Sequence, residues 1–258
     1  MTTPKGTLYL VPAPLDFGCE SQAPITDALP NGTLQVAARL THWICENAKS
    51  TRAVLKRVGE VLPLAAPLQQ QTITELPREV HKIGDHHPGS FDANPLLQAA
   101  LQGHDLGLIS EAGMPAIADP GSSVVRAAHA LGINVVPLVG PCSLLLALAA
   151  SGLNGQNFAF VGYLPQDAEA RVQRIKALEA LALKTGQTQL FIETPYRNVA
   201  VWESLLKTLS PTMRLSVSSG LTLETARTRS ALVKEHRMAC VDANAISALA
   251  APCVFGLG

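Results

Sequence analysis

The sequence predicts an α/β protein, and two observations support this class. Short apolar runs of strand length alternate with segments of helical spacing along most of the 258-residue chain. The alternation is clearest over residues 106–153, which give strand, loop, helix, strand, loop and helix in succession. A strand–helix–strand unit with short connections implies a right-handed crossover. We therefore expect parallel strands with ligand-binding loops at their carboxyl ends.

The first part of the chain starts with this alternation and then loses it. Repeated prolines and a run of glutamines interrupt residues 63–95, where we expect long loops and one edge strand. Asn94 is expected to cap a helix that begins at Pro95 and runs to Gln102. The other expected elements are strands over 7–11 and 42–45 and helices over 33–40 and 48–58.

The next stretch carries two loops with unusual residues after its strands. We expect buried strands over 106–110 and 133–138 and a helix over 144–150. Between the strands, Asp119 is the expected N-cap of a helix that has Pro120 at its first position and ends at Gly132. The loops at 110–115 and 139–143 follow the two strands, which makes them the expected ligand-binding loops.

A second alternating block follows Gly152. One of its expected helices is amphipathic, with an inward face formed by Val172, Ile175, Leu178 and Leu181. The expected elements are strands over 157–162, 189–193, 215–218, 231–233 and 253–256 and helices over 168–184, 197–209 and 242–249. We therefore expect two α/β domains, residues 1–139 and residues 140–258.

Composition excludes several classes of protein. The chain is 47% hydrophobic and only 16% charged, which is typical of a compact globular protein and not of a disordered one. Its formal net charge is zero, which argues against broad nonspecific binding of nucleic acid but leaves a local basic patch open. Aromatic residues make up 4% of the chain, so platforms for stacking bases are not expected.

The cysteines and the apolar runs indicate the cellular compartment in which the protein is expected. Five cysteines are widely spread without a Cys-x-x-Cys pair, so we expect free thiols in a reducing environment. The longest apolar run, 144–150, is far short of the roughly 20 residues that a membrane span needs. The start of the sequence also lacks the pattern of a secretion signal. We expect a soluble cytoplasmic protein with no membrane partner.

Several segments, in order, resemble the tetrapyrrole-methylase superfamily. SEAGMPAIADPG (110–121) and VVPLVGPCSLLLALAASGL (135–153) are similar to its SDAGTP, SDPG and PGPSALxxALxASGL patterns. LYLVPAP (8–14) resembles its LYLVxTP, FAFVGYLP (158–165) its FxFxGFLP, and LFIETPYR (190–197) its LIFYESPHR. Within the superfamily, the chain is most similar to the ribosomal RNA small subunit methyltransferase I type.

The resemblance implies a methyltransferase that uses S-adenosylmethionine, bound in the cleft between two α/β domains. It also implies a homodimer and, for the ribosomal RNA type, methylation of a ribose 2′-hydroxyl. The cofactor-binding positions that it implies in this sequence are Pro14, Ile109, Ser110, Glu111, Gly113, Met114, Ser143, Leu144, Glu193 and Leu221.

Several of these residues also have purely structural interpretations. Glu111 stands where the family has Asp, and it fits equally a solvated loop carboxylate or a helix-cap acceptor. Gly113 is expected to adopt a positive φ in either case. Ser143 fits the N-cap of the helix that follows it. Thr194 as N-cap, with Pro195 at the first helical position, accounts for most of the segment after residue 193.

Two nearby candidates for chemistry are weak. Cys142 has no evident base beside it, so we do not expect a nucleophile there. Asp85, His86, His87 and Asp92 lack the spacing of a tetrahedral metal site and lie in a loop rich in Pro and Gly, so no metal is expected. The residues that would serve as catalytic base are not identified by the sequence.

Departures from the family concern the segments expected to face the substrate. The family's AEDTR segment corresponds here to the altered and enlarged run Cys45–Arg52. Its ARELTKxxEE segment corresponds to Val217–Thr225, where Ser218 and Ser219 replace an Arg-Glu pair. These changes leave two alternatives open: a methyltransferase acting on a small, tetrapyrrole-like molecule, and a protein that binds the cofactor without catalysis.

An RNA substrate would require a local basic face, because the net charge is zero. The candidate RNA contacts are Arg171, Arg174 and Arg197, with Lys176, Arg227 and Arg229 nearby in the sequence. Ordinary solvated charges on helix faces are the alternative interpretation.

Overall fold

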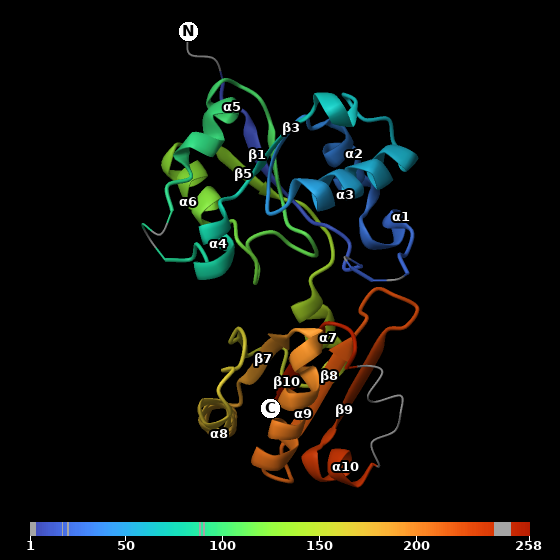
Figure 1. Cartoon of the computed structure of the whole chain (residues 1–258), viewed down its shortest axis with the longest axis vertical. Coiled ribbons are helices and arrows are strands. Elements are labelled where there is room, and N and C mark those ends of the chain that lie inside the picture. Colours follow the sequence, from blue (N-terminus) through green and yellow to red (C-terminus); the bar gives the residue numbers. More distant parts are fainter. Residues whose placement is uncertain (1–3, 17, 20, 88, 90, 240–248) are drawn as a thin grey trace. The chain divides into compact units, whose positions relative to one another are not determined.

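The computed structural model describes residues 4–16, 18–19, 21–87, 89, 91–239 and 249–258 (Figure 1). The chain divides into two compact units, Met1–Pro141 and Cys142–Gly258. Each unit contains one five-stranded sheet, so the expected α/β class is confirmed. The expected domain boundary after residue 139 stays a prediction.

The first unit is built on a sheet whose neighbouring strands are all parallel, in the order β3-β2-β4-β1-β5. Its strands are β1 (Thr7–Val11), β2 (His42–Cys45), β3 (Thr72–Glu75), β4 (Leu106–Ile109) and β5 (Asn134–Pro137). β3 occupies an edge, as the sequence predicted for its segment. Because the strands are parallel, the loops after β1, β4 and β5 emerge at one edge of the sheet.

Helices cover both faces of this sheet (Figure 1). They are α1 (Ile25–Ala28), α2 (Asn31–Arg39), α3 (Ala48–Val61), α4 (Arg78–Ile83), α5 (Gln98–Leu101) and α6 (Ser122–Ala130). Trp43 and Ile109 belong to a core shared with α2 and α3, whereas Ile44 and Leu108 belong to the core beneath α5 and α6. This switch between adjacent residues follows from the two-residue repeat of a strand.

The start of α6 differs from the expectation. Asp119 is not the N-cap; Gly121 holds that position with φ +136°. Asp85 supplies the acceptor instead, since its Oδ2 accepts hydrogen bonds from Gly121 N (2.9 Å), Ser123 N (2.8 Å) and Ser123 Oγ (2.6 Å). Burial alone would raise the pKa of Asp85, but these hydrogen bonds and the nearby Arg126 together lower it. A residue from the irregular segment therefore caps a distant helix.

The irregular segment contains more structure than the sequence indicated. α4 lies within residues 63–95, where only loops and a strand were expected. Asn94 is not a cap: a 3-10 turn over Asn94–Leu97 follows Ala93 and leads into α5. The Asp92 carboxylate accepts a hydrogen bond from Asn94 N at 3.0 Å. The expected helix over 95–102 is thus a short composite of two helical types.

The second unit has a mixed sheet in the order β6-β7-β10-β8-β9, in which only β6 and β7 are parallel neighbours. Its strands are β6 (Phe158–Phe160), β7 (Thr188–Glu193), β8 (Arg214–Ser219), β9 (Arg227–Leu232) and β10 (Cys253–Leu257). All five lie at positions that the sequence predicted within a few residues. The expected helix over 242–249 falls almost wholly outside the described residues.

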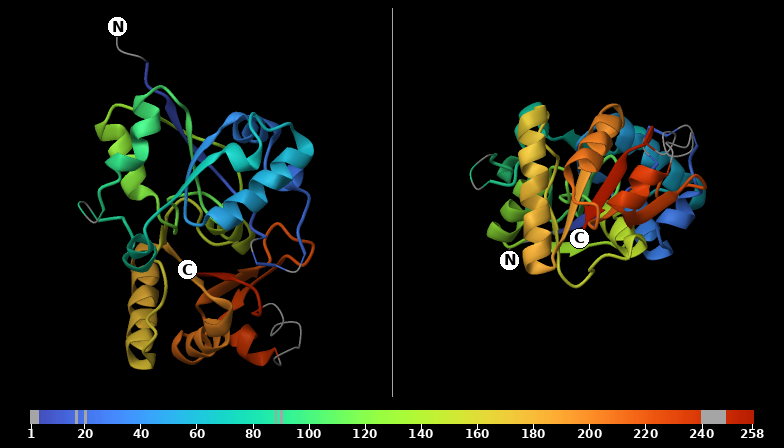
Figure 2. Two further views of the ribbon diagram at one scale, coloured as in Figure 1. Left: turned by 45° about the horizontal axis from the view of Figure 1, so that its top comes forward. Right: turned by 90° about the horizontal axis from the view of Figure 1, so that it is seen from below.

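The helices of this unit are α7 (Ser143–Ser151), α8 (Ala168–Thr185), α9 (Pro195–Thr208) and α10 (Val233–Met238). α8 and α9 pack side by side (Figure 2). The buried face of α8 contains Arg171, Ile175, Leu178 and Ala182. Leu181, which was expected to point inward, is 40% exposed, so that expectation is wrong.

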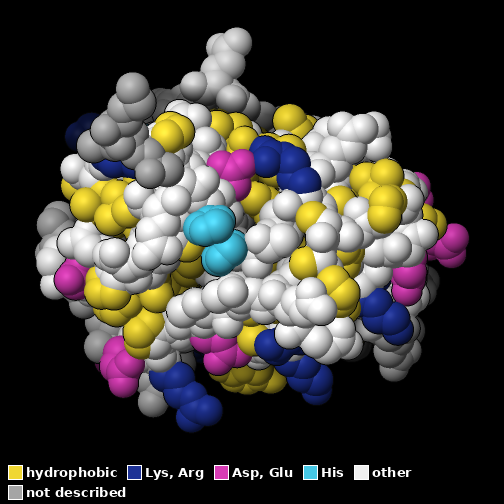
Figure 3. Space-filling model, turned by 90° about the horizontal axis from the view of Figure 1, so that it is seen from above, with side chains coloured by type: hydrophobic (Ala, Val, Ile, Leu, Met, Phe, Trp, Pro, Cys, Tyr) yellow, Lys and Arg dark blue, Asp and Glu magenta, His cyan; other side chains and the backbone are white. Residues whose placement is uncertain are grey.

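No helix in the described part of the chain is long and apolar enough to cross a membrane. On the face shown in Figure 3, Lys and Arg side chains lie apart from one another, between acidic and hydrophobic ones. This scattered arrangement agrees with the formal net charge of zero. Any basic binding surface must therefore be local.

Candidate functional site

The loops after β1 and β4 are joined by backbone hydrogen bonds. Ala13 N donates to Gly113 O, and Gly113 N donates to Ala13 O, both at 2.9 Å. Gly113 has φ +74°, which confirms the positive φ expected from the sequence. The bonds fix the loop that contains Ser110, Glu111 and Met114 against the turn that contains Pro14.

The loop after β5 packs against the same place. A Cβ added to Gly140 would lie 2.2 Å from Cγ of Pro12, a distance that no side chain tolerates. A Cβ on Gly113 would lie 3.6 Å from Pro141 O. Glycine at 140 therefore permits the close approach, and three strand-end loops of the first unit form one continuous surface.

Three carboxylates gather at this surface. Glu46, which follows β2, accepts a hydrogen bond from Glu111 N through its Oε2 at 3.1 Å. Burial and the nearby charges of Glu46 and Glu111 raise the pKa of Asp119 to about 7. Ser110 is only 4% exposed, and its side chain lies beside Asp119, where it partly counters the rise in the pKa of that carboxyl. The loop thus presents carboxylates together with a buried hydroxyl group.

The same loop has unusual backbone conformations. Ala116 and Ala118 adopt φ values of +63° and +65°, in the left-handed region that disfavours residues with a side chain. Such conformations cost on the order of 1–3 kcal/mol each and are concentrated at binding and catalytic sites. Their position between Glu111 and Asp119 places this backbone strain in the candidate ligand-binding loop.

A hollow of about 1000 Å³ adjoins this loop within the first unit. Glu111 and Pro14 form part of its lining, with the segment that follows β1 on one side and α3 on the other. Arg57 of α3 binds Asp16 through two hydrogen bonds of 2.9 Å and donates a third to Ala23 O at 2.7 Å. The lining of the hollow at Asp16 and Ala23 is therefore fastened to α3.

The remaining cofactor candidates lie in the second unit. Leu144, at the start of α7, belongs to an apolar cluster with Leu148, Leu190 and Val254, and Leu221 packs against this cluster. Ser143 is the first residue of α7, and Cys142 occupies the N-cap without a side-chain hydrogen bond. The expectation that Ser143 is the N-cap is therefore wrong by one residue. The structure brings Leu144 and Leu221 together.

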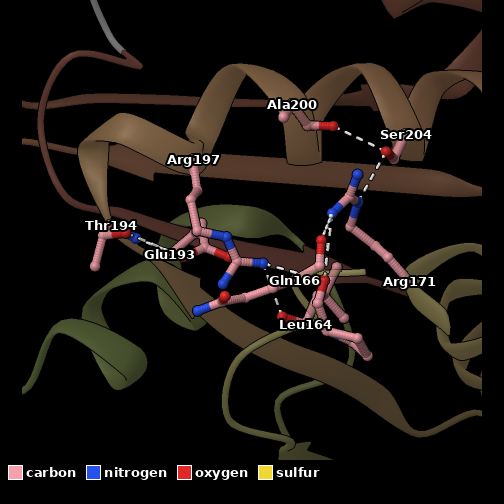
Figure 4. Close-up of polar contacts among 9 residues, drawn as sticks. Leu164, Gln166, Arg171, Glu193, Thr194, Arg197, Ala200 and Ser204 are labelled. Carbon is pink, nitrogen blue, oxygen red and sulfur yellow. Dashed lines mark hydrogen bonds and ion pairs between the residues drawn. The ribbon is translucent and has the colours of Figure 1, made fainter. Parts of the chain in front are cut away.

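Glu193 ends β7 and is only 3% exposed (Figure 4). Its Oε1 accepts hydrogen bonds from Thr194 N at 2.9 Å and Thr194 Oγ1 at 3.3 Å. Its Oε2 lies 3.2 Å from Arg197 Nη2 in an ion pair. Thr194 holds the N-cap position of α9 and Pro195 follows it, as expected, although the Thr194 side chain makes no cap hydrogen bond.

Two arginines fasten the chain that follows β6 (Figure 4). Arg197 Nη2 donates to Leu164 O at 2.9 Å and to Pro165 O at 3.1 Å. Arg171 Nη1 donates to Gln166 O at 2.9 Å and to Pro165 O at 3.3 Å, and its Nε donates to Ser204 Oγ at 3.0 Å. We call this arrangement of Arg171 and Arg197 around residues 164–166 the arginine clamp.

The clamp corrects one expectation about an RNA-binding face. Arg171 is 9% exposed and its donors are bound by protein, so it does not lie on the exposed face that the sequence suggested. Arg174, on the next turn of α8, is exposed. Ser218 and Ser219, which were expected to face the substrate, are 1% and 4% exposed and lie in β8.

Sequence reasoning missed Glu46 and Asp16 and assigned Asp119 a capping role. Glu46 lies 65 positions before Glu111, and only the pairing of β2 with β4 brings the two together. The candidate metal ligand Asp85 is used as the cap of α6. Among the described residues, no three His, Cys, Asp or Glu side chains lie close enough to hold a metal ion.

Comparison with known proteins gives sequence relatives and solved structures. The chain is 32% identical over 192 residues to the ribosomal RNA small subunit methyltransferase I of Pseudomonas aeruginosa, covering 74% of this chain and 58% of that protein. It is 33% identical over 218 residues to the protein of that name from Xylella fastidiosa, covering 84% and 68%. The chain thus spans less than two thirds of the Pseudomonas relative.

Two solved structures share the fold. Uroporphyrin-III-C-methyltransferase from Thermus thermophilus gives a TM-score of 0.53 at 16% identity, covering 98% of this chain and 94% of that one. The methyltransferase CobJ gives 0.56 at 18% identity, covering 97% and 93%. The sequence model of the tetrapyrrole (corrin/porphyrin) methylases matches residues 34–236. With most of its length matched and the two-sheet α/β fold in common, the chain belongs to the tetrapyrrole methylase family, whose members use S-adenosylmethionine.

Proposed function

We propose that this chain is an S-adenosylmethionine-dependent methyltransferase that methylates a ribose 2′-hydroxyl of small-subunit ribosomal RNA. The observation that carries the proposal is the surface formed by the loops after β1, β4 and β5, with its buried Ser110 hydroxyl and its carboxylates. Sequence relatives named as ribosomal RNA small subunit methyltransferase I support the choice of acceptor.

The residues of this surface fit the cofactor chemically. S-adenosylmethionine carries positive charge on its sulfonium and amino groups, and Glu46 and Glu111 supply negative charge at the loop. Ser110 Oγ, beside Asp119, is a further polar group of the same loop. Pro14, Ile109, Gly113 and Met114 complete the proposed contacts in the first unit. Ser143, Leu144, Glu193 and Leu221 remain proposed contacts from the second.

The chain's own residues would contribute alignment and proton transfer. When bound, the cofactor supplies an electrophilic methyl group. A hydroxyl that attacks it must lose a proton, and Asp119, with its pKa of about 7, is the proposed acceptor because it is half ionised near neutral pH. The fixed Ala13–Gly113 bridge keeps the loop from shifting, and positioning of the reactants is a major source of rate in such displacements.

Calorimetric titration with S-adenosylhomocysteine tests the cofactor site. We expect one site per chain, and binding at least about tenfold weaker when Glu46→Gln and Glu111→Gln are combined, because a charge-assisted hydrogen bond is worth roughly 1.5–3 kcal/mol. Glu79→Gln removes an exposed carboxylate of α4 that does not line the hollow, and it serves as the control. Failure of the wild type to bind S-adenosylhomocysteine at millimolar concentration would contradict the proposal.

Transfer of a tritiated methyl group to unmodified small-subunit ribosomal RNA tests the acceptor. A product that withstands alkaline hydrolysis identifies a 2′-O-methyl group, because the blocked hydroxyl cannot attack the adjoining phosphate. If the protein binds the cofactor but does not label RNA, the small-molecule acceptor or the noncatalytic alternative replaces it. A hollow of about 1000 Å³ is large enough for such a molecule, so a panel of tetrapyrrole-like acceptors is the natural second assay.

A further inference from the structure

The exposed face of α3 carries a row of cations. Lys49, Arg52 and Lys56 are all exposed and follow one another at helical spacings of three and four residues. With a rise of 1.5 Å per residue, the row extends over about 10 Å along the helix axis. The buried side of α3, with Val54, Leu55 and Val58, fixes which side chains point outward.

These three cations form no ion pair with the described residues. Arg52 donates only a long hydrogen bond of 3.4 Å to Ala48 O, within its own helix. The neighbouring Arg57 provides a contrast, since Asp16 binds it through two hydrogen bonds. Glu60 is the one acidic residue further along this face of α3. The charge of the row is therefore available to a ligand.

The row follows the edge of the hollow beside the proposed cofactor loop. Lys49 and Lys56 line that hollow together with Pro14 and Glu111, whereas Arg52 does not. Both ends of the row therefore lie at the lining of the hollow and Arg52, between them, lies outside it, so the three cations do not converge on one point inside the hollow. A small anion needs converging donors, but a chain of regularly spaced anions fits an exposed row.

We propose that Lys49, Arg52 and Lys56 bind successive phosphates of the RNA substrate, so that the acceptor nucleotide enters the hollow beside Glu111. This inference rests on the proposed function and names the surface that recognises its substrate. Phosphate contacts of this kind set position and register rather than sequence. The row also lies in the enlarged Cys45–Arg52 region and its continuation in α3, where the sequence departs from the family pattern.

The test is a filter-binding titration of unmodified small-subunit ribosomal RNA, transcribed in vitro, over a series of salt concentrations. The variant combines Lys49→Ala, Arg52→Ala and Lys56→Ala. For single-stranded RNA each lost phosphate contact lowers the slope of log affinity against log salt by about 0.7, so we expect a decrease of about 2. At roughly 0.15 M salt this corresponds to about fourfold per contact and about 50-fold for the row.

Matched variants separate the row from nonspecific charge. Lys184→Ala, Lys207→Ala and Lys234→Ala together remove the same charge from exposed positions of the second unit and should change affinity less than about threefold. Arg174→Ala with Lys176→Ala tests the face first expected on α8. The variant that combines Lys49→Arg, Arg52→Lys and Lys56→Arg keeps the charges and should bind RNA as the wild type does, which would attribute the loss in the alanine variant to charge.

S-adenosylhomocysteine affinity, measured in parallel, should stay unchanged in the α3 variant. The inference is overturned if that variant keeps wild-type RNA affinity, or if the charge-matched variant loses as much. In either case, methylation of RNA by the wild type leaves the proposed function standing. If the wild type binds S-adenosylhomocysteine but neither binds nor methylates RNA, the RNA part of the proposed function and this inference fall together.

Discussion

Replacement of Asp85 is the most direct test of whether the irregular segment, residues 63–95, stabilises the first unit. Replacing Asp85 with Ala removes the shared acceptor of Gly121 N, Ser123 N and Ser123 Oγ. Loss of an N-cap costs about 1–2 kcal/mol, and buried donors left without an acceptor add on the order of 1–3 kcal/mol. Because the effects overlap, we expect the free energy of unfolding of the first unit to fall by about 3 kcal/mol.

For a unit of this size, 1 kcal/mol moves the thermal midpoint by roughly 2–4 °C, so the midpoint should fall by about 10 °C. Fluorescence of Trp43 reports on the first unit, because its side chain is buried there and bonds to Gln71. The chain has two tryptophans, and the second, Trp202, lies in the other unit. A Trp202→Phe background therefore isolates the signal.

Two further variants make the result interpretable. Asp85→Asn keeps an oxygen that can accept the bonds but loses the charge, so it should show about half of the effect, in line with the stronger bonds of ionised acceptors. Asp92→Ala removes an exposed carboxylate of the same segment that accepts a hydrogen bond from Asn94 N, and it should change stability by less than about 1 kcal/mol.

The pH dependence has a definite sign. The pKa of Asp85 is lowered in the folded chain, so its stabilising effect is present above the unfolded pKa of about 3.9. The effect is lost as the pH falls through the lowered folded value. The advantage of the wild type over Asp85→Asn should shrink in that range. An Asp85→Ala midpoint within about 2 °C of the wild type would refute the capping role.

Three other predictions concern the second unit, the proton acceptor and assembly. Arg171→Ala should lower the stability of the second unit by about 2–3 kcal/mol, measured by Trp202 fluorescence, because carbonyls of the arginine clamp lose a charged donor. Exposed Arg174→Ala should change it by less than about 0.5 kcal/mol, and equal effects would contradict the clamp. Methyl transfer should rise with pH through about 7 as Asp119 loses its proton, and Asp119→Asn should abolish that rise; a profile that is unaltered in the variant would exclude Asp119 as the acceptor. Light scattering should give a homodimer of this 27.2-kDa chain, and Leu145→Glu with Leu146→Glu, at exposed apolar positions of α7, should favour the monomer; a wild-type monomer at micromolar concentration would refute this prediction.

The sequence predicted those elements of the fold whose signals are local. β1 and β2 match their expected ranges, and α3 begins at Ala48 as expected. β8 and β9 also lie close to the strands expected over 215–218 and 231–233. These elements have periodic apolar residues or a clear cap, such as Asn47, whose side chain accepts hydrogen bonds from Lys49 N and Ser50 N. Periodic apolar residues and helix caps involve residues that are close together in the sequence, so a single sequence is enough to find them.

The failures involve contacts between distant segments. Asp119 has the sequence context of an N-cap, but Asp85 reaches Gly121 N from 36 positions away and takes that role. Arg171 has the context of a solvated helix residue, but the carbonyls of residues 165 and 166 bind it in the clamp. The gathering of Glu46 with Glu111 depends on the strand order. Such relations follow from the tertiary fold and carry no periodic signal.

The bridge between Ala13 and Gly113 has a consequence for how this family can diverge. Its two hydrogen bonds join main-chain groups, so the coupling demands only a nitrogen that can donate at position 13 and a residue that accepts positive φ at position 113. Ala13 and Met114 each stand where the family pattern has Thr, and the bridge is intact. Substitutions in one loop therefore do not require matching substitutions in the other. An alignment would show no covariation between the two loops, although hydrogen bonds join them.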